Sequence, residues 1–223
     1  MSGPGAEEEG QLTLVGSAQF RTFRNVWMLE ELGVPYNLIS CFPRSQEANE
    51  VNPLGKVPTL KDGDFVMYES AAINTYLGDK FRGAAPPLVP LAGTRARGRY
   101  EQLVFFLMAE VDAQGLWIHR KHEALGKVFG AIPQAVEAAK AHTMRCFGVL
   151  AEDLKQAGGP YLLGEDFSAA DILLVHCMNW ASTIGWLPEV GSEGDLKGLF
   201  DYWELCKQRP AFKRATEKKE AKL

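Results

Sequence analysis

The spacing of apolar and polar positions along this chain changes near residue 83. Before that point, apolar runs of strand length at residues 12–15, 36–40, 57–61 and 65–67 predict four β-strands. Between the first two runs, the apolar stripe from Phe23 to Leu32 recurs at helical spacing and is followed by a glycine, which predicts a helix. After residue 83 the apolar positions predict helices alone.

The order of elements in the first part restricts its topology. A strand, a helix and a strand with a connection of this length predict a right-handed parallel crossover. A polar stretch at residues 44–51 predicts a short helix, the Asp62-Gly63 pair predicts a hairpin of two antiparallel edge strands, and Ser70 opens a final helix. This order is the thioredoxin-like arrangement, an α/β fold, and we assign it to residues 12–82.

The second part is predicted to be all-α. Residues 83–93 hold three closely spaced prolines and predict a linker, because proline prevents a regular helix. Residues 94–223 then predict a helical bundle domain, and the small, acidic residues 1–11 predict a disordered leader. The helices are expected at residues 95–124, 135–157, 172–186 and 195–207, with a charged tail beyond.

Ser168 and Asp171 have the spacing of a capping box, in which each side chain bonds the backbone of the other. The run behind them, residues 172–186, is very apolar. This entry predicts a buried central helix, and the box serves folding rather than chemistry.

Charge and composition exclude several classes of function. The net charge of −4 leaves no basic footprint for nucleic acid or an anionic membrane. No apolar run approaches the ~20 residues of a membrane span, and no signal peptide is apparent. The four cysteines are scattered without a CxxC pair, which predicts reduced thiols in the cytoplasm, and the four histidines show no metal-binding pattern.

The stretch from Asn52 to Ala72 carries the most chemistry. A cis Val57-Pro58 bond at the entry of a strand turns the backbone of Val57 outward, where it can pair with a peptide. Ser70 at a helix start offers a hydroxyl and backbone N–H groups to a carboxylate, and Lys56 is available for a second carboxylate. In the alternative reading this is an ordinary hairpin and helix, with Pro58 a rigid turn.

Residues 52–73 resemble the NPxGKVPxL…ESxAI signature of glutathione transferases, and residues 161–172 resemble the YLxGxxFSxADI segment of their helical second domain. The resemblance extends over residues 12–212. It implies a cytosolic-type, detoxifying transferase with glutathione as co-substrate and no metal. The partners it implies are a small apolar electrophile and a second copy of the chain in a homodimer.

The resemblance also implies roles for individual residues. Lys56 would pair with the glycyl carboxylate, Val57 beside Pro58 with the cysteinyl backbone, and Glu69 with Ser70 would hold the γ-glutamyl end. The first loop would place Phe20 and Arg21 near the ligand. The electrophile pocket would include positions of the long helix, namely Met108, Val111, Gln114, Gly115 and Trp117.

Phe20 departs from the family pattern, because it occupies the position of the residue that donates a hydrogen bond to the thiol. Three explanations remain open. Ser17 supplies the hydroxyl instead; Thr22 or backbone N–H groups near Arg21 polarise the sulfur; or the donor has been lost. We take Ser17 as the catalytic candidate.

The loss of the donor favours a rival function, a non-catalytic protein that retains the glutathione site for ligand binding or assembly. A thiol-disulfide or dehalogenase-type enzyme is a third possibility, but the first loop has no cysteine, and Cys41 follows the second strand. The final tripeptide, residues 221–223, resembles a peroxisomal import address and makes the peroxisome the alternative location.

Overall fold

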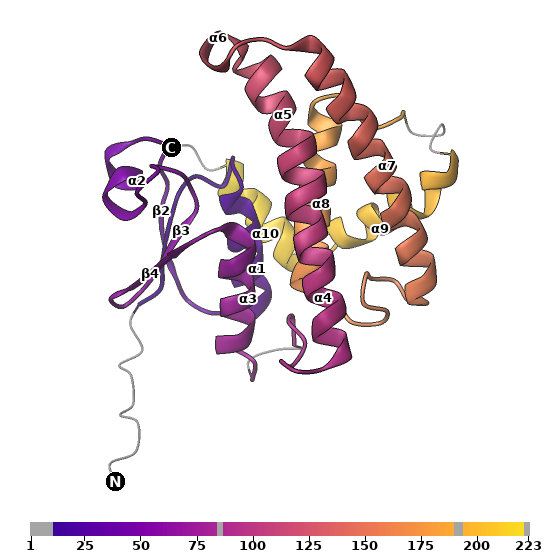
Figure 1. Ribbon diagram of the computed structural model, residues 1–223. Helices are drawn as coiled ribbons and strands as arrows, with labels where there is room; N and C mark the ends of the chain where they lie inside the picture. The colour runs from indigo at the N-terminus through magenta and orange to yellow at the C-terminus, as the bar shows by residue number, and fades with distance from the viewer. Residues whose placement is uncertain (1–10, 84–86, 190–193, 221–223) are drawn as a thin grey trace. The chain divides into compact units, whose positions relative to one another are not determined.

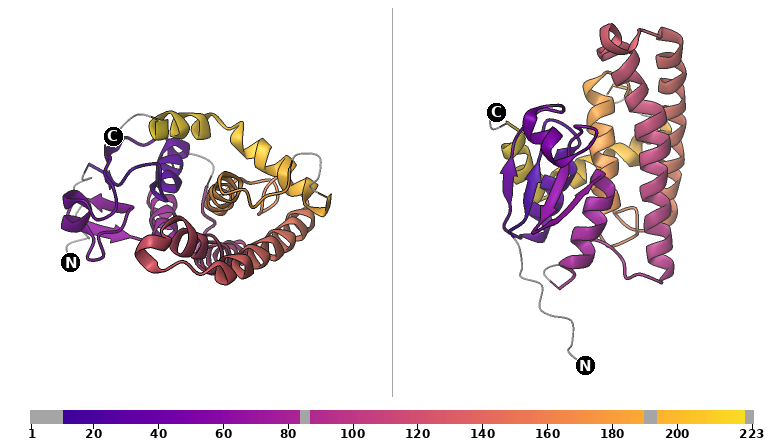
Figure 2. Two further views of the ribbon diagram at one scale, coloured as in Figure 1. Left: turned by 90° about the horizontal axis from the view of Figure 1, so that it is seen from above. Right: turned by 60° about the vertical axis from the view of Figure 1, so that its left-hand side comes forward.

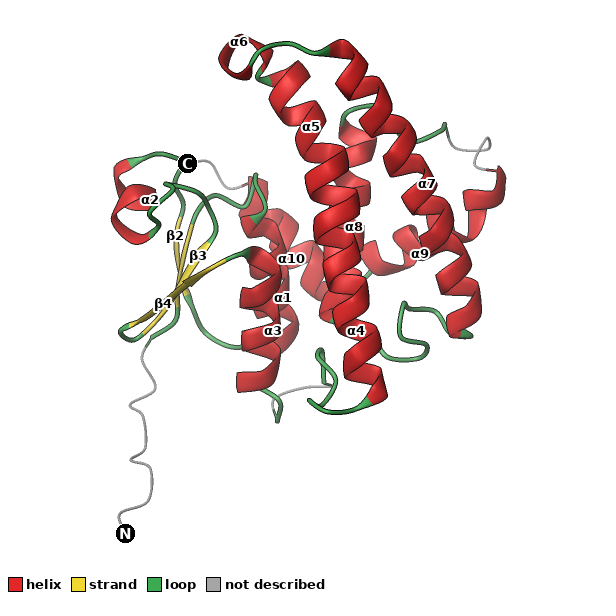
Figure 3. Ribbon diagram, viewed as in Figure 1, coloured by secondary structure: helices red, strands yellow, loops and turns green. Residues whose placement is uncertain are grey.

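The computed structural model describes residues 11–83, 87–189 and 194–220, and the chain divides into two compact units. The first unit comprises Met1–Ala85 together with Pro210–Leu223, and the second comprises Pro86–Arg209. The strands of the described residues all lie in the first unit (Figure 3). Most of the predicted leader, part of the linker and the C-terminal tripeptide lie outside the described residues.

The first unit has the predicted thioredoxin-like topology. Its described sheet has the order β2-β1-β3-β4, with β1 parallel to β2 and antiparallel to β3, and with β3 antiparallel to β4. Figure 1 shows α1 and α3 on one side of this sheet and α2 on the other. The elements are β1 (Thr13–Val15), α1 (Thr22–Leu32), β2 (Asn37–Ile39), α2 (Gln46–Val51), β3 (Thr59–Asp62), β4 (Phe65–Tyr68), α3 (Ser70–Lys80) and α10 (Pro210–Glu220).

Local sequence explains most of these boundaries. Helix α1 ends where Gly33 adopts a left-handed conformation with φ of 66°, and its N–H bonds to the Leu29 carbonyl. Ser45 caps α2 by accepting a hydrogen bond from the Ala48 N–H. The hairpin differs from the prediction in two respects: its turn is Gly63-Asp64, and β3 is an inner strand because it pairs with both β1 and β4.

Helices joined by turns and loops make up the described residues of the second unit. The predicted long helix does run over residues 95–124, but it widens into π-helical turns after Phe106. The central helix ends at Thr183 rather than at Trp186, and Gly185 follows with φ of 70°. The elements are α4 (Arg95–Phe106), η1 (Leu107–Leu116), α5 (Trp117–His119), η2 (Arg120–Ala124), α6 (Gly126–Phe129), α7 (Pro133–Ala157), α8 (Ala169–Thr183), η3 (Gly194–Leu196) and α9 (Lys197–Lys207).

Asp171 is the polar centre of the second unit, and the predicted capping box is confirmed. The carboxylate is completely buried and accepts hydrogen bonds from the backbone N–H and hydroxyl of Ser168. It also accepts from the Leu162 N–H at 3.0 Å and the Tyr202 hydroxyl at 2.9 Å. Burial raises the pKa of Asp171, although these four donors act in the opposite direction. The box therefore ties α8 to α9 and to the loop before it.

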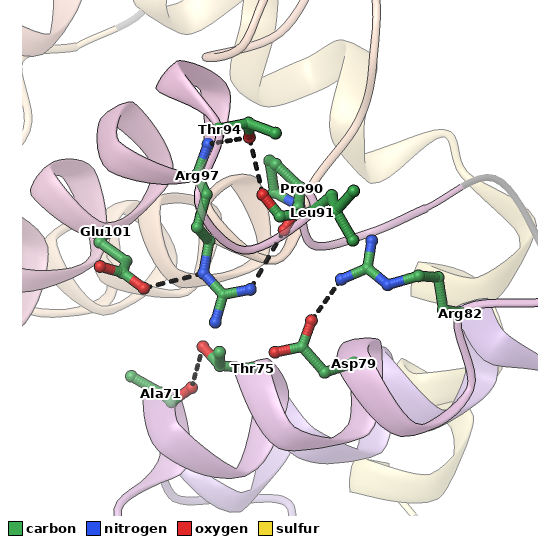
Figure 4. A network of polar contacts seen from close by, with 9 residues as sticks. All are labelled: Ala71, Thr75, Asp79, Arg82, Pro90, Leu91, Thr94, Arg97 and Glu101. Carbon is green, nitrogen blue, oxygen red and sulfur yellow. Dashed lines mark hydrogen bonds and ion pairs between the residues drawn. The ribbon is translucent and has the colours of Figure 1, made fainter.

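The described end of the predicted linker belongs to the helical unit. Leu88 and Val89 are buried, and the Leu88 carbonyl accepts a hydrogen bond of 2.8 Å from the Ala169 N–H. Figure 4 shows how α4 holds the residues before it: Arg97 donates to the Pro90 carbonyl and pairs with Glu101 at 2.8 Å. These contacts explain why the second unit begins before the predicted boundary at residue 94.

The end of the chain returns to the first unit, so the assignment of residues 94–223 to one helical domain is wrong at its C-terminal end. The charged tail expected after Pro210 is helical: Pro210 begins α10, as suits a residue that has no N–H to lose in a first helical turn. Phe212 packs edge-on against Trp27 and Phe23 of α1, with ring centroids 4.9 and 5.7 Å apart. Figures 1 and 2 both show α10 beside α1.

A polar cluster completes this contact around Glu30 of α1. Its carboxylate pairs with Arg214 at 2.8 Å and Lys218 at 2.7 Å, and it accepts a hydrogen bond of 3.0 Å from the Tyr36 hydroxyl. Burial would raise the pKa of Glu30, but the hydrogen bonds from Lys218, Arg214 and Tyr36 outweigh burial and lower it. Burial raises the pKa of Tyr36 to about 12, so the phenol stays neutral.

Replacing Glu30 with glutamine is expected to make the stability of the protein less sensitive to acid. The pKa of Glu30 is lower in the folded state than the ordinary value for a glutamic acid, ~4.3. The cluster therefore contributes its full stabilisation at pH values above ~4.3, and this contribution is lost as the pH falls through the pKa of the folded state. Urea unfolding midpoints at neutral pH and near pH ~4 test this. Equal losses for the wild type and Glu30→Gln would contradict it.

Candidate functional site

The predicted site residues meet at one end of the sheet, because strand pairing aligns the ends of β1, β3 and β4. Val15, the last residue of β1, lies opposite Thr59, the first residue of β3, and Thr59 lies opposite Tyr68, the last residue of β4. The loops after β1 and β4 and the loop before β3 therefore leave the sheet together (Figure 1). These loops carry residues 16–21, 56–58 and 69–70.

The first loop holds Ser17 in a fixed place. Its backbone N–H donates to the Cys41 carbonyl at 2.9 Å, and its hydroxyl oxygen accepts from the Gln19 N–H at 3.2 Å. The residue is only 3% exposed. Among the residues that the structure describes, no acceptor takes the hydroxyl proton of Ser17.

Thr22, the alternative donor, begins α1 and is completely buried. Its hydroxyl has no hydrogen-bond partner within the described ranges. A Cβ atom at Gly16 would lie 2.6 Å from both the Thr22 hydroxyl oxygen and the Val57 Cβ, so a side chain at Gly16 would clash. Gly16, with φ of 129°, thus allows the end of β1, the start of α1 and the Val57 loop to approach one another.

Val57 and Pro58 are joined by a cis peptide bond, as the sequence predicts. Pro58 is buried, whereas Val57 is partly exposed and Lys56 is exposed. Cys41 is buried, with 6% of its surface exposed.

Ser70 begins α3 as predicted, but its hydroxyl accepts a hydrogen bond of 3.1 Å from the guanidinium of Arg24, which is completely buried. Asn25 donates to the Ser70 carbonyl at 2.8 Å and to the side chain of Asn74 at 2.7 Å. Glu69 is exposed and has a left-handed φ of 73°. The buried network of Arg24, Asn25 and Asn74 therefore positions Ser70, and it places a positive charge behind the predicted carboxylate site.

Sequence reasoning gave no role to this network or to Arg44. The Arg44 N–H donates to the Gly55 carbonyl at 2.7 Å, which places Arg44 next to the predicted carboxylate ligand Lys56. Arg44 is exposed and has a left-handed φ of 68°, unusual for a residue with a side chain. The signal available in the sequence was the pair of polar residues, Arg24-Asn25, inside an otherwise apolar helical stripe.

Phe20 belongs to the first loop and packs against the loop that follows β2. It is partly buried, and its ring meets the ring of Phe42 edge-on, with centroids 5.8 Å apart and an interplanar angle of 70°. Arg21 follows as the last residue before α1 and is also partly buried. The position expected to hold a hydroxyl donor thus presents an aromatic ring.

Comparison with known proteins decides the family. Residues 22–80 match the glutathione S-transferase N-terminal domain, and residues 115–210 match the C-terminal domain. A stringent starvation protein A homolog from Haemophilus ducreyi is 30% identical over 193 residues, which are 84% of this chain and 81% of that protein. The chain belongs to the glutathione S-transferase family.

Other members of the glutathione S-transferase family agree at lower identity. Glutathione S-transferase 3 from Zea mays is 27% identical over 188 residues, 81% of this chain and 79% of that protein. The structure of glutathione transferase URE2P6 from Phanerochaete chrysosporium in complex with oxidized glutathione superposes with a TM-score of 0.78. It is 24% identical and covers 94% of this chain and 96% of its own, which supports the fold.

The predicted electrophile-pocket residues of this glutathione S-transferase family member divide into two groups. Val111 is completely buried, and a Cβ at Gly115 would lie 2.2 Å from the Thr143 hydroxyl oxygen, so both serve the packing of η1 within the helical unit. Met108 and Trp117 are partly exposed, and Gln114 is exposed. These three keep surface that a ligand can reach.

Within residues 11–83, 87–189 and 194–220, no three His, Cys, Asp or Glu side chains gather closely enough to hold a metal ion. None of the described helices combines the length and apolar character that a membrane crossing requires.

Proposed function

We propose that this protein binds glutathione at the end of its sheet and activates the thiol for attack on a small apolar electrophile. The observation that supports this most is the meeting of three segments: the first loop, the cis-Pro58 loop and the start of α3. The thiolate is the attacking form, and a free thiol with a pKa of ~8.5 is mostly protonated at neutral pH. The protein must therefore stabilise the thiolate.

Each end of the tripeptide has a matching group. Lys56, with Arg44 beside it, pairs with the glycyl carboxylate, and the backbone of Val57 before Pro58 pairs with the cysteinyl residue. The γ-glutamyl end meets Glu69 and Ser70, supported by the buried charge of Arg24. The first loop brings Phe20, Arg21 and Ser17 to the sulfur, where the Ser17 hydroxyl donates to the thiolate.

Of the residues that the family resemblance assigns to the electrophile pocket, Met108, Gln114 and Trp117 keep accessible surface. We further propose a homodimer in the cytoplasm. The exposed side chains of Phe65, Val66 and Tyr68 on the edge strand β4 support a subunit contact.

A non-catalytic glutathione-binding protein is the second candidate, and Phe20 favours it because phenylalanine has no proton to donate. Titrating the thiolate absorbance of protein-bound glutathione separates the two functions. We expect a bound pKa at least about one unit below that of free glutathione, equivalent to ~1.4 kcal/mol of preferential thiolate stabilisation. Binding with an unshifted pKa would instead establish the non-catalytic function.

A further inference from the structure

We propose that the segment joining α5 to α7 is a membrane-contact site, at which exposed apolar side chains enter the surface of an anionic phospholipid bilayer. The segment comprises η2, α6 and the residues that follow them, 120–132, and we call it the α6 tip. Figure 1 shows α6 at one end of the helical unit, beside the ends of α5 and α7. The inference is independent of the proposed function, because it concerns a surface of the second unit alone.

Exposed apolar side chains gather at the α6 tip. Seven large apolar side chains are exposed among the described residues of the second unit, and three of the seven lie within positions 128–132. These three are Val128, Phe129 and Ile132, with exposed fractions of 65%, 39% and 44%. Single exposed apolar side chains are normal on a protein surface, whereas a group of neighbouring ones is typical of a contact site.

Hydrogen bonds hold the backbone of the tip in place. The N–H groups of Val128 and Phe129 both donate to the Leu125 carbonyl, at 2.8 and 3.0 Å. The Nδ1–H of His122 donates to the Gly130 carbonyl at 2.8 Å, and Gly130 itself has a left-handed φ of 85°, which glycine adopts without strain. The tip therefore presents its apolar side chains in a fixed arrangement, and contact with a surface costs little additional ordering.

The charge of the tip complements an anionic lipid surface. Three of the residues 120–132 are basic and one, Glu123, is acidic, which gives the tip a net charge of +2 with histidine neutral. The basic residues are Arg120, Lys121 and Lys127. The Lys121 ammonium lies 6.0 Å from the centre of the Phe129 ring, so charge and apolar surface adjoin each other. The charge of −4 on the whole chain, from which no membrane contact is expected, averages over this local excess of positive charge.

Basic and apolar side chains contribute separately to contact with a bilayer. Lysine and arginine attract anionic headgroups, and their long side chains keep the charge in the aqueous layer while neighbouring apolar groups enter the boundary with the acyl chains. Val128 and Phe129, directly after Lys127, have the arrangement that such a contact requires. The α6 tip therefore fits an anionic bilayer surface in both charge and polarity.

A second copy of the chain is the other occupant to consider, and the charge of the tip disfavours it. An isologous contact places the same patch of both subunits together. The basic side chains of one tip would then face those of the other, and like charges brought together across an interface are repulsive. An anionic lipid surface supplies the opposite charge instead.

Co-sedimentation of the purified full chain with vesicles tests this inference. The vesicles consist of phosphatidylcholine alone or of phosphatidylcholine with about 30% phosphatidylserine. We expect the wild type to bind the anionic vesicles at least about tenfold more tightly than the neutral ones. The double variant Lys121→Gln/Lys127→Gln should lose roughly tenfold or more of its affinity for anionic vesicles. Val128→Ser/Phe129→Ser should lose roughly tenfold, because the apolar groups no longer enter the bilayer.

Phe105→Ser is the matched control, because Phe105 is 71% exposed but lies on α4. It should leave vesicle binding unchanged. A wild type that does not bind anionic vesicles, or tip variants that bind them as the wild type does, would overturn the membrane contact.

Sedimentation velocity without vesicles tests the other occupant. An oligomer that the wild type forms and the tip variants do not would assign the tip to a second copy of the chain and would also overturn the membrane contact. Glutathione binding, measured on the same variants, should equal that of the wild type. Failure of the membrane contact is thereby distinguished from failure of the proposed function, which a wild type without glutathione binding would show.

Discussion

Replacing Asp171 with alanine is expected to lower the free energy of unfolding by about 3–5 kcal/mol, because it leaves several buried hydrogen-bond donors without an acceptor. The side chain is completely buried, and it accepts from two backbone N–H groups, of Leu162 and Ser168, and from two hydroxyls. The backbone groups have no other acceptor once the carboxylate is removed. Urea unfolding followed by far-UV circular dichroism measures the loss.

Two further variants make this result interpretable. Asp171→Asn keeps one oxygen acceptor and is expected to fold with a smaller loss, so it remains measurable where the alanine variant does not fold. Asp201→Ala is the control: that carboxylate is 65% exposed and pairs with Lys197 one helical turn away, a contact worth at most ~0.5 kcal/mol. Similar losses for Asp171→Ala and Asp201→Ala would contradict the importance of the capping box.

Replacing Ser17 with alanine is expected to lower kcat for a conjugation reaction by ~10²-fold, as loss of one donor to a developing anion typically does. The reason lies in the hydrogen bonds of its hydroxyl. The oxygen accepts from the Gln19 N–H, which orients the group, and the proton remains available. Because the proposed contact of Ser17 is with the sulfur rather than with the carboxylates, the KM for glutathione should change by less than about twofold.

Thr22→Val tests the rival donor in the same assay. The Thr22 hydroxyl is completely buried and has no partner in the described part of the chain, so its removal should leave turnover intact and slightly stabilise the protein. A large loss in Thr22→Val with none in Ser17→Ala would transfer the donor role to Thr22. Unchanged turnover in both variants would indicate that backbone N–H groups stabilise the thiolate.

Local sequence accounts for most of the fold. Gly33 ends α1, Ser45 begins α2, and the spacing of Ser168 and Asp171 forms the capping box, because each of these depends on residues within one helical turn. The cis bond between Val57 and Pro58 is also local, because only a peptide bond that precedes proline adopts the cis form at modest cost. The family itself followed from two motifs, at residues 52–73 and 161–172.

Elements that depend on distant partners were less predictable. The charged segment after Pro210 is rich in residues of high helix propensity, but the sequence alone predicts only a charged tail there. In the structure it packs as α10 against α1, where Arg214 meets Glu30 across 184 positions of the chain. The position of α10 depends on the surface of α1, which lies far away in the chain, so the local sequence pattern does not reveal it.

The sequence by itself determined the family and the order of the strands and main helices before Pro210, and it predicts which residues would bind a peptide with two carboxylates. Only the tertiary structure decided which side chains act together at that site. The charge of Arg24 lies behind Ser70, 46 positions away, and Phe20 faces Phe42 rather than a hydroxyl. Hydrophobic periodicity predicts which face of a helix or strand is buried. The residues that pack against that face depend on the tertiary structure of the whole chain.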